Sequence, residues 1–412
     1  MARELSRSQI PQGWKYGLLD SFAERCSGHT PSKSFPEYWN GGIKWISLAD
    51  TFRLDKGLVT ETDKEISQEG INNSSAQIHP AGTVVLSRDA GIGKSGVMAE
   101  SMAVSQHFIA WKCDANKKIH NWFLYNWLQF HKPEFERQAV GSTIKTIGLP
   151  FFKKLKIALP SYEEQRKIAK ILSTWDKAIT TTERLIATSQ QQKKALMQQL
   201  LTGKKRLLNP ETGKVFEGAW KHYSFGDIAK IKTKKYDPRT EVVSLPCIEL
   251  EHLSQDTGRI LGAVNSLELA SIKNRFQRGD VLFGKLRPYL RKFARPDFDG
   301  VCSTEIWVLK VTSKIMSEYL YQFIQTNIFV SEANKSAGSK MPRADWGVVS
   351  ELVLKLPTLS EQQKIASVLT AADKEIELLQ AKLAHLKEEK KALMQQLLTG
   401  KRRVKVETTE AA

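Results

Sequence analysis

The sequence has few cysteines and no long apolar run, and both absences exclude classes of protein. Four cysteines are spread widely over 412 residues and form no CxxC pair. This pattern indicates neither a disulfide framework nor a zinc site. The sequence also has no signal peptide and no run of about 18 apolar residues of the kind that crosses a membrane. We therefore expect a cytoplasmic protein.

The short motifs of common enzyme classes are also missing. The sequence has no HExxH, no GxSxG, no DEAD-type helicase box and no NPPY-like tetrapeptide of an amino-methyltransferase. GIGKS (91–95) matches only the end of a phosphate-binding loop, because Arg88 stands where GxxxxGK[ST] begins with glycine. A restriction-type nuclease needs PD followed by ExK; Asp297 is followed by Glu305, but Trp307 replaces the lysine. We expect a chain without a catalytic site of its own.

What the sequence has in excess is positive charge. Lysine and arginine outnumber aspartate and glutamate by 62 to 44, which gives a formal net charge of +18, and the pI is near 9.6. An excess of this size indicates a polyanionic partner, most simply nucleic acid.

An internal repeat divides the chain. The stretch KKALMQQLLTGK at 193–204 recurs letter for letter at 390–401. Upstream, LPSYEEQRKIAKIL begins at Leu159 and LPTLSEQQKIASVL at Leu356, an offset of 197 residues that needs no gap. GTVVLSR (82–88) aligns with GDVLFGK at the same offset. The chain therefore reads as two copies of a globular segment followed by a helix.

Each helical copy has coiled-coil spacing and contains no Gly or Pro between LP and TGK. The predicted a positions are Leu172, Ile179, Ile186, Lys193 and Leu200 in the first copy, and Leu369, Ile376, Leu383, Lys390 and Leu397 in the second. The predicted d positions are Trp175, Thr182, Ser189 and Leu196, and Ala372, Leu379, Leu386 and Leu393. A lysine occupies the same a position in both copies, which suggests that the two helices pair with each other. A helix of about 40 residues is on the order of 60 Å long, so we expect a spacer.

The predicted fold class is α+β, with two globular α/β-type domains separated by two long helices that pair as an antiparallel coiled coil in a pseudo-two-fold repeat. The predicted segments are domain 1 (1–158), helix 1 (159–208), domain 2 (209–355), helix 2 (356–401) and a tail (402–412).

The strongest chemical signal lies in domain 2, where basic and aromatic residues alternate over 273–296. Basic side chains above aromatic packing suit phosphate contact, and arginine also reads guanine. A solvated charged surface is the alternative. The candidate DNA contacts of the two domains are Arg88, Lys94, Lys145, Lys285, Arg287, Arg291, Lys292, Lys340 and Arg343.

These residues resemble the specificity (S) subunit of Type I restriction–modification systems. SGHTPSKSFPEYWNGGIKWISLAD (27–50) is similar to the start of a target-recognition domain in that family, which adds Thr30 and Ser32 as candidate DNA contacts. His29 replaces a glycine common there, and domain 2 lacks the TPS…YW stretch. GDVLFGKLRPYLRK, LPxxxEQxKIAxxL and KKALMQQLLTGK also match, so the resemblance covers nearly the whole chain.

The resemblance implies a DNA reader in which each domain recognises one half of a split target and the helices set the gap. It also implies partners: double-stranded DNA, two modification subunits that carry S-adenosylmethionine, and motor-nuclease subunits that use ATP and Mg. This chain would bind no cofactor. Candidate contacts with the modification subunits are Glu164, Gln165, Lys167, Glu361, Gln362 and Lys364. The alternatives are a coiled-coil adaptor that binds nucleic acid without sequence preference, and a stand-alone nuclease.

Overall fold

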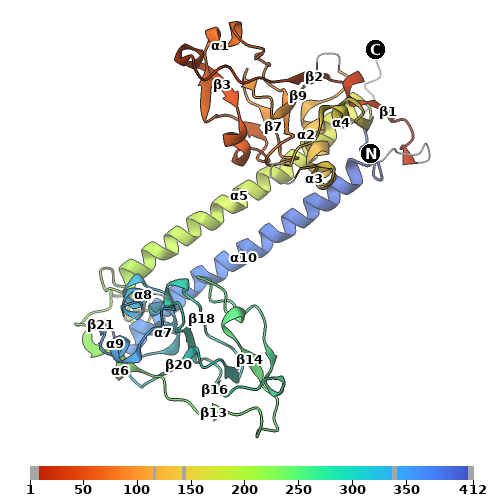
Figure 1. The fold of residues 1–412 in the computed structure, drawn as a ribbon. Coiled ribbons are helices and arrows are strands. Elements are labelled where there is room, and N and C mark those ends of the chain that lie inside the picture. Colours follow the sequence, from red (N-terminus) through yellow and green to blue (C-terminus); the bar gives the residue numbers. More distant parts are fainter. Residues whose placement is uncertain (1–8, 115–116, 142–144, 336–340, 407–412) are drawn as a thin grey trace. The chain divides into compact units, whose positions relative to one another are not determined.

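The described part of the chain forms two compact units, each built around one globular domain (Figure 1). The computed structural model describes residues 9–114, 117–141, 145–335 and 341–406. Unit 1 comprises Met1–Glu183 and Lys382–Ala412, and unit 2 comprises Arg184–Ala381. Both long helices cross the boundary, so each unit contains a globular domain, part of the helix that follows it and part of the other helix. No described helix is long and apolar enough to span a membrane.

Unit 1 folds its globular domain from three sheets and four short α-helices within the described residues. The strand orders are β2-β9-β6-β7-β4, β5-β3-β8 and β1-β10. The bounds are β1 Lys15–Leu18, β2 Glu24–Ser27, β3 Trp39–Ile46, β4 Leu58–Val59, β5 Lys64–Ile66, α1 Gln68–Asn72, β6 Val84–Ser87, β7 Ser95–Met98, β8 Ala103–Val104, β9 Phe108–Lys112, α2 Asn121–Phe130, α3 Lys132–Gln138, α4 Leu149–Lys153 and β10 Lys156–Leu159.

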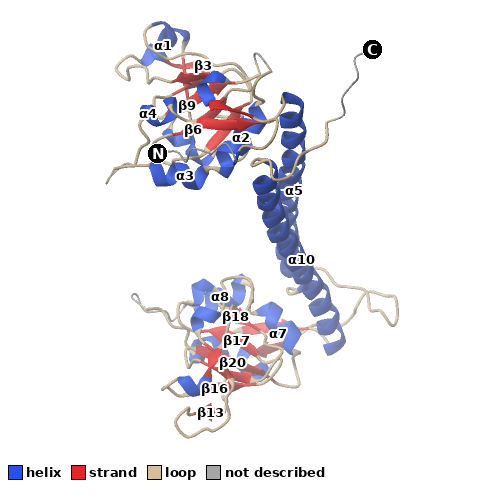
Figure 2. Ribbon diagram, turned by 90° about the vertical axis from the view of Figure 1, so that its right-hand side faces the viewer, coloured by secondary structure: helices blue, strands red, loops and turns tan. Residues whose placement is uncertain are grey.

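The central strand β6 is apolar on both faces because both faces are covered. Val84 and Leu86 lie in the core cluster that includes the buried side of α2. Val85 points the other way, into a cluster with Ile46 and Met98. This alternation is the period of two that a strand imposes on its side chains. The aromatic run NWFLYNWLQFH (121–131) predicts a buried helix. The structure has α2 there, with six of its ten residues buried, and Figure 2 shows it beside β6.

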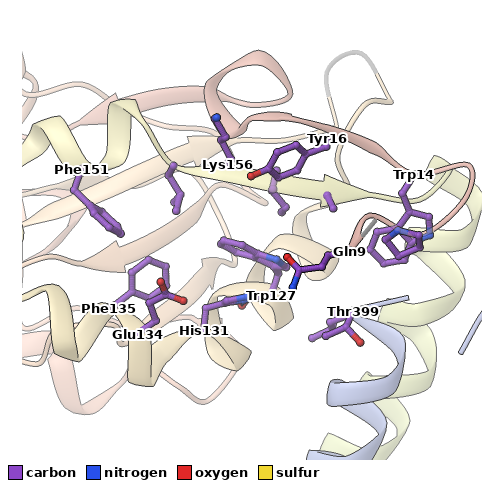
Figure 3. Close-up of a pocket in the computed structure, with 15 residues that line it drawn as sticks. Gln9, Trp14, Tyr16, Trp127, His131, Glu134, Phe135, Phe151, Lys156 and Thr399 are labelled. Carbon is purple, nitrogen blue, oxygen red and sulfur yellow. The ribbon is translucent and has the colours of Figure 1, made fainter. Parts of the chain in front are cut away.

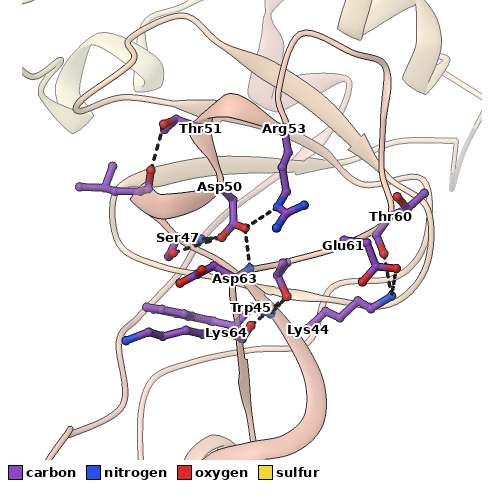
Figure 4. Close-up of polar contacts among 12 residues, drawn as sticks. Lys44, Trp45, Ser47, Asp50, Thr51, Arg53, Thr60, Glu61, Asp63 and Lys64 are labelled. Carbon is purple, nitrogen blue, oxygen red and sulfur yellow. Dashed lines mark hydrogen bonds and ion pairs between the residues drawn. The ribbon is translucent and has the colours of Figure 1, made fainter. Parts of the chain in front are cut away.

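A buried carboxylate holds the turn after β3 together (Figure 4). Asp50 is fully buried and accepts hydrogen bonds from the backbone N–H groups of Ser47 at 2.9 Å and Asp63 at 2.7 Å. Arg53 Nε donates to the same carboxylate at 3.1 Å. A buried charge needs such partners, since desolvation without them is costly. The WISLAD stretch (45–50) is therefore part of the framework of this domain.

Unit 2 also folds its globular domain from three sheets and short α-helices, but the strand orders and the positions of the helices differ from those of unit 1. The strand orders are β12-β20-β17-β18, β13-β16-β19-β14-β15 and β11-β21. The bounds are β11 Lys221–Ser224, α6 Phe225–Ile228, β12 Ala229–Lys230, β13 Lys235–Tyr236, β14 Pro246–Ile248, β15 Val264–Asn265, β16 Lys273–Phe276, β17 Val281–Gly284, β18 Phe293–Ala294, β19 Gly300–Cys302, β20 Ile306–Val311, α7 Ser317–Phe323, α8 Asn327–Ala333, α9 Trp346–Ser350 and β21 Val353–Leu356.

The strand pair β6–β9 of unit 1 recurs as β17–β20 of unit 2. Ser87 pairs with Phe108 in unit 1, and Gly284 pairs with Ile306 in unit 2. The first and last strands of each globular domain also pair, as β1–β10 and β11–β21. The predicted alignment of GTVVLSR with GDVLFGK is confirmed by this pairing.

The two long helices are α5 (Tyr162–Leu200) and α10 (Leu359–Leu397), each 39 residues long. Every residue predicted at an a or d position is buried or half-buried. The helices run antiparallel. In unit 1, Lys390 Nζ lies 2.6 Å from Asp176 Oδ1, and in unit 2, Lys193 Nζ lies 2.6 Å from Asp373 Oδ1. The two lysines predicted in the seam thus each bind an aspartate of the other helix.

Each long helix also begins with a buried glutamate that binds an arginine beyond the end of the other helix. In unit 1, the Glu164 carboxylate is 2% exposed and lies 2.7 Å from Arg403 Nη2. In unit 2, the Glu361 carboxylate is 1% exposed and lies 2.5 Å from Arg206 Nε, while Nη2 donates to its second oxygen at 2.7 Å. We call these two pairs the Glu–Arg clasps. They tie the start of each helix to the chain that leaves the other.

The residue after each clasp glutamate joins its helix to the globular domain. Gln165 accepts a hydrogen bond from the backbone N–H of His120 at 2.8 Å, and Gln362 accepts one from Met316 at 2.9 Å. Each side-chain amide also donates to two backbone carbonyls. The EQ pair in both copies of the repeat is therefore explained by contacts inside the chain.

These contacts correct the predicted surface for a modification subunit. Four of its six side chains are buried inside the units: Glu164, Gln165, Glu361 and Gln362. They present no surface to a partner. Lys167 and Lys364 are half-buried, and Lys167 Nζ donates to the carbonyl of Lys405 at 3.0 Å. For these two lysines the partner contact stays a prediction.

Removing a clasp arginine should destabilise its unit. The change Arg206→Ala leaves Glu361 buried without its cation, and breaking a buried pair in this way costs about 3 kcal/mol in the free energy of unfolding. Denaturant unfolding followed by circular dichroism measures the loss. The control is Arg166→Ala, since the Arg166–Glu163 pair is 57% and 56% exposed and should contribute less than about 1 kcal/mol. Equal midpoints for the two variants would contradict the structural role of the clasp.

Candidate nucleic-acid interface

The predicted DNA contacts include two basic residues at equivalent strand ends. Arg88 follows β6 in unit 1, and its backbone N–H donates to the carbonyl of His107 at 3.0 Å. Lys285 follows β17 in unit 2, and its N–H donates to the carbonyl of Glu305 at 2.9 Å. The backbone of each basic residue is therefore fixed at the end of a central strand pair, so only its side chain has to be ordered when a ligand binds.

In unit 1, five side chains beside this strand end form one hydrogen-bonded row. His107 Nδ1 lies 2.5 Å from Asp89 Oδ2, and the Thr146 hydroxyl donates to Asp89 Oδ1. Gln106 Nε2 lies 3.4 Å from His107 Nε2. The Thr30 hydroxyl donates to Gln106 Oε1 at 2.5 Å. We call these five residues the polar row. It joins four segments that are far apart in the sequence.

Cations flank the polar row. Arg88 Nε lies 3.6 Å from Asp89 Oδ1, so the guanidinium is beside the carboxylate. Lys145 directly precedes Thr146 and is exposed. No hydrogen bond or ion pair of the Lys145 side chain is found among the described residues. The structure thus brings Thr30, Arg88 and Lys145 into one region of unit 1.

The other two candidates of domain 1 have structural contacts. Lys94 Nζ donates to the carbonyl of Thr51 at 3.3 Å, in a loop that connects β6 directly to β7. No helix follows this glycine-rich loop, so it differs from a nucleotide-binding loop. Ser32 is exposed, and its carbonyl accepts a hydrogen bond from Trp39 Nε1 at 3.1 Å.

Unit 2 carries different side chains on the same backbone arrangement. The carbonyl of Arg88 accepts a hydrogen bond from the N–H of Ile147 at 2.9 Å, and the carbonyl of Lys285 accepts one from Ala344 at 2.8 Å. Arg343 therefore occupies the position that Thr146 has in unit 1. Its Nε lies 3.0 Å from Glu305 Oε2, where unit 1 has a threonine, an aspartate and a histidine.

The arginines of the basic segment in unit 2 divide into two kinds. Arg287 and Arg291 flank the short 3-10 helix Pro288–Leu290 with φ of 52° and 47°. Arg291 Nη1 donates to the carbonyl of Gln325 at 3.0 Å, and Lys292 Nζ donates to a backbone carbonyl at 2.6 Å. Arg287 is exposed, and its side chain has no hydrogen bond or ion pair with any described residue. Arg287 is thus an available cation, whereas Arg291 and Lys292 bind backbone carbonyls within the domain. Lys340 lies outside the described residues.

Two kinds of residue at this interface could not be picked out from the sequence motifs. Gln106 and His107 give no signal of their own in the sequence, because only the fold brings them to Thr30 and Asp89. In unit 2, a groove of about 760 Å³ is lined partly by Lys232 and Lys234. Both lysines are exposed and have no partner among the described side chains. The run KIKTKK (230–235) was the available signal for this groove.

A second cavity, of about 230 Å³, lies in unit 1 beside the end of α10 (Figure 3). Its lining includes the aromatic residues Trp14, Trp127 and Phe135. The ring of His131 lies 4.0 Å from that of Trp127, and its Nδ1 donates to the carbonyl of the same residue at 2.8 Å. Burial lowers the pKa of His131, which favours the neutral ring. We interpret this cavity as packing between the helix end and the domain.

The chain is similar to known proteins over nearly its whole length. Residues 11–188 and 217–388 match the family model described as the Type I restriction modification DNA specificity domain. The Type I restriction enzyme MjaVIII specificity subunit of Methanocaldococcus jannaschii is 24% identical over 427 residues, which cover 98% of this chain and 96% of that protein.

Two solved structures share the fold. The S subunit of a Type-I restriction-modification system from M. genitalium superimposes with a TM-score of 0.60 at 16% identity, over 96% of this chain and 98% of that one. A chain from a structure on complex assembly and conformational transition of the type I R-M system gives a TM-score of 0.57 at 15% identity, over 95% and 99%.

Two arginine substitutions should separate binding from stability. Arg287→Ala should weaken DNA binding across all sequences and lower the slope of log affinity against log salt by about 1, as expected for one lost phosphate contact. Arg291→Ala should instead lower thermal stability, because it removes the bonds to the segment at Gln325. Salt-dependent binding assays and thermal melts check the pair. A melting temperature lowered by Arg287→Ala alone would contradict the assignment.

Proposed function

Since the chain belongs to the Type I restriction–modification DNA specificity family, its role is to give such a complex its sequence specificity, and we propose that each globular domain reads one half of a split DNA target. The observation that carries the proposal is the duplicated strand end. Arg88 and Lys285 occupy equivalent backbone positions, yet their surroundings differ in chemistry. One scaffold presented twice, with different side chains, suits a target whose two halves differ in sequence.

We also propose that the antiparallel helices set the gap between the two half-sites. The clasps and the seam lysines fix the register of α5 against α10 in each unit. A fixed register gives a fixed length, and DNA-binding modules held at a fixed separation select half-sites at a fixed spacing.

The chemistry of the complex is assigned to other subunits. We propose that two modification subunits carry S-adenosylmethionine and methylate adenine, and that motor-nuclease subunits use ATP and Mg, with no cofactor bound by this chain. Lys167 and Lys364 remain the candidate contacts for the modification subunits. Because the substrate is cellular DNA, the complex should act in the cytoplasm. We keep the proposed division of the chain into domain 1, helix 1, domain 2, helix 2 and tail, with the ranges 1–158, 159–208, 209–355, 356–401 and 402–412.

Two other functions would lead to different observations. A nucleic-acid adaptor without sequence preference would bind random DNA as tightly as any selected sequence, whereas a reader keeps a specificity ratio. A stand-alone nuclease would need Asp297 and Glu305 at one metal site, but Glu305 is paired with Arg343 and Trp307 lies in the core.

The first experiment is to co-express the chain with a modification subunit of its host's Type I system and to map methylated adenines in the host DNA. We expect a split motif with a fixed gap that disappears when this chain is omitted. Methylation that persists without the chain, or none in its presence, would contradict the proposal.

Exchanging one domain should change one half of the target. If residues 1–158 are replaced by the corresponding segment of another family member, methylation mapping should show a new first half and an unchanged second half. The reciprocal exchange of residues 209–355 is the matched control and should change the other half. A change in both halves after either exchange would show that the domains do not read independently.

Lengthening both helices should widen the gap alone. One heptad inserted between Glu183 and Arg184 and another between Ala381 and Lys382 leave both clasps and both seam lysines in place. Seven residues add about 10 Å of helix, which corresponds to about 3 base pairs along the DNA axis. Methylation mapping should show the same two halves farther apart. Insertion into one helix only is the control, since it leaves the helices unequal and should abolish methylation.

A further inference from the structure

The polar row of unit 1 contains an exposed amide whose orientation is fixed by its neighbours. Gln106 is exposed at its position between β8 and β9, and His107 beside it is half-buried. A glutamine side chain in water turns freely, but here Thr30 binds its carbonyl oxygen and His107 lies next to its nitrogen. The loss of rotamer freedom has thus occurred before any ligand arrives.

The direction of each hydrogen bond in the row follows from the Asp89 carboxylate. A carboxylate only accepts, so the proton of His107 is assigned to Nδ1, which lies 2.5 Å from Asp89 Oδ2. In the neutral ring, His107 Nε2 is then an acceptor and faces the N–H of Gln106. The oxygen of Gln106 in turn accepts from Thr30. The row therefore has one consistent sequence of donors and acceptors.

This arrangement leaves Gln106 with one free donor and one free acceptor. A primary amide has two N–H donors and two carbonyl lone pairs. His107 takes one donor and Thr30 takes one lone pair. The remaining N–H and lone pair match the N7 acceptor and N6–H donor that adenine presents in the major groove, which is the usual bidentate contact of glutamine.

The segment that carries Thr30 is fitted closely against the loop of Gln106. A Cβ on Gly28 would lie 1.8 Å from the carbonyl oxygen of Val104, so only glycine permits this approach. The N–H of His29 donates to the same carbonyl at 3.0 Å. The indole N–H of Trp45 donates to the carbonyl of His29 at 3.0 Å. These contacts place the Thr30 hydroxyl on Gln106.

The equivalent place in unit 2 is built from different groups. Glu305 corresponds to His107 by its backbone contact with Lys285, and Arg343 corresponds to Thr146 because the residue after each donates to the carbonyl of the equivalent basic residue. Different side chains on equivalent backbone hydrogen bonds are what two domains that read different sequences would have. The flanking cations Arg88 and Lys145 can meanwhile bind phosphates without regard to sequence.

We propose that Gln106 is a base-reading residue of domain 1 and that it contacts an adenine in the major groove of the first half-site, with Thr30 and His107 as positioning residues. The inference rests on the proposed function of the chain. It also reassigns Thr30, which acts through Gln106 rather than on DNA directly.

The test is selection of binding sites from a randomised DNA duplex library by the full chain in complex with its modification subunits. The wild-type chain should yield a split motif with at least one adenine in the first half. Gln106→Ala should relax the preference at one adenine by about 5- to 150-fold, the range for one lost bidentate contact. Gln106→Glu should move the preference at that position toward cytosine, whose amino group a carboxylate accepts.

Conservative variants and a matched control make the test specific. Thr30→Val should relax the same position and Thr30→Ser should restore it, because serine keeps the hydroxyl. Gln68→Ala is the control, since Gln68 is equally a surface glutamine but lies on α1; it should leave the motif unchanged. A wild-type motif that survives Gln106→Ala and Gln106→Glu at every position would overturn this inference alone. The absence of any wild-type motif would overturn the proposed function.

Discussion

The structure depends on two carboxylates that have almost no contact with water. Glu164 and Glu361 each lie at the start of a long helix, and each is paired with an arginine from beyond the end of the opposite helix. An antiparallel pair of helices has many possible registers if its seam is apolar. A buried carboxylate that needs its arginine favours one of them, and the seam lysines with their aspartates favour the same one.

The pairing of the helices could be predicted because it depends on period and repetition, which are properties of the sequence. The heptad positions, the aromatic helix α2 and the equivalence of β6 with β17 all follow from patterns of this kind. The role of Glu164 and Gln165 could not be predicted in the same way. A polar residue at the start of a helix has the same appearance in a sequence whether it faces solvent, a partner or the rest of its own chain. Only the contacts with Arg403 and His120 decide the question.

The candidate interface was predictable in part for the same reason. Basic residues in a basic segment predict a nucleic-acid contact, and Arg287 and Lys145 are indeed exposed. Arg291 looks identical in the sequence, but it is bonded within the domain. Gln106 carries no charge and belongs to no motif, so it becomes a candidate only when four distant segments are assembled around it. Charge can locate a binding surface from sequence, whereas the groups that discriminate between bases depend on tertiary contacts.

The two clasps differ in how much chain lies between their partners, and this affects the order in which a ribosome can complete the units. Arg206 and Glu361 are 155 residues apart, and unit 2 is one continuous stretch of chain. Glu164 and Arg403 are 239 residues apart, and unit 1 needs the last part of α10. The first domain to be synthesised is thus the last to be completed. Until Arg403 leaves the ribosome, Glu164 has no partner and the early part of α5 has no helix to cover it.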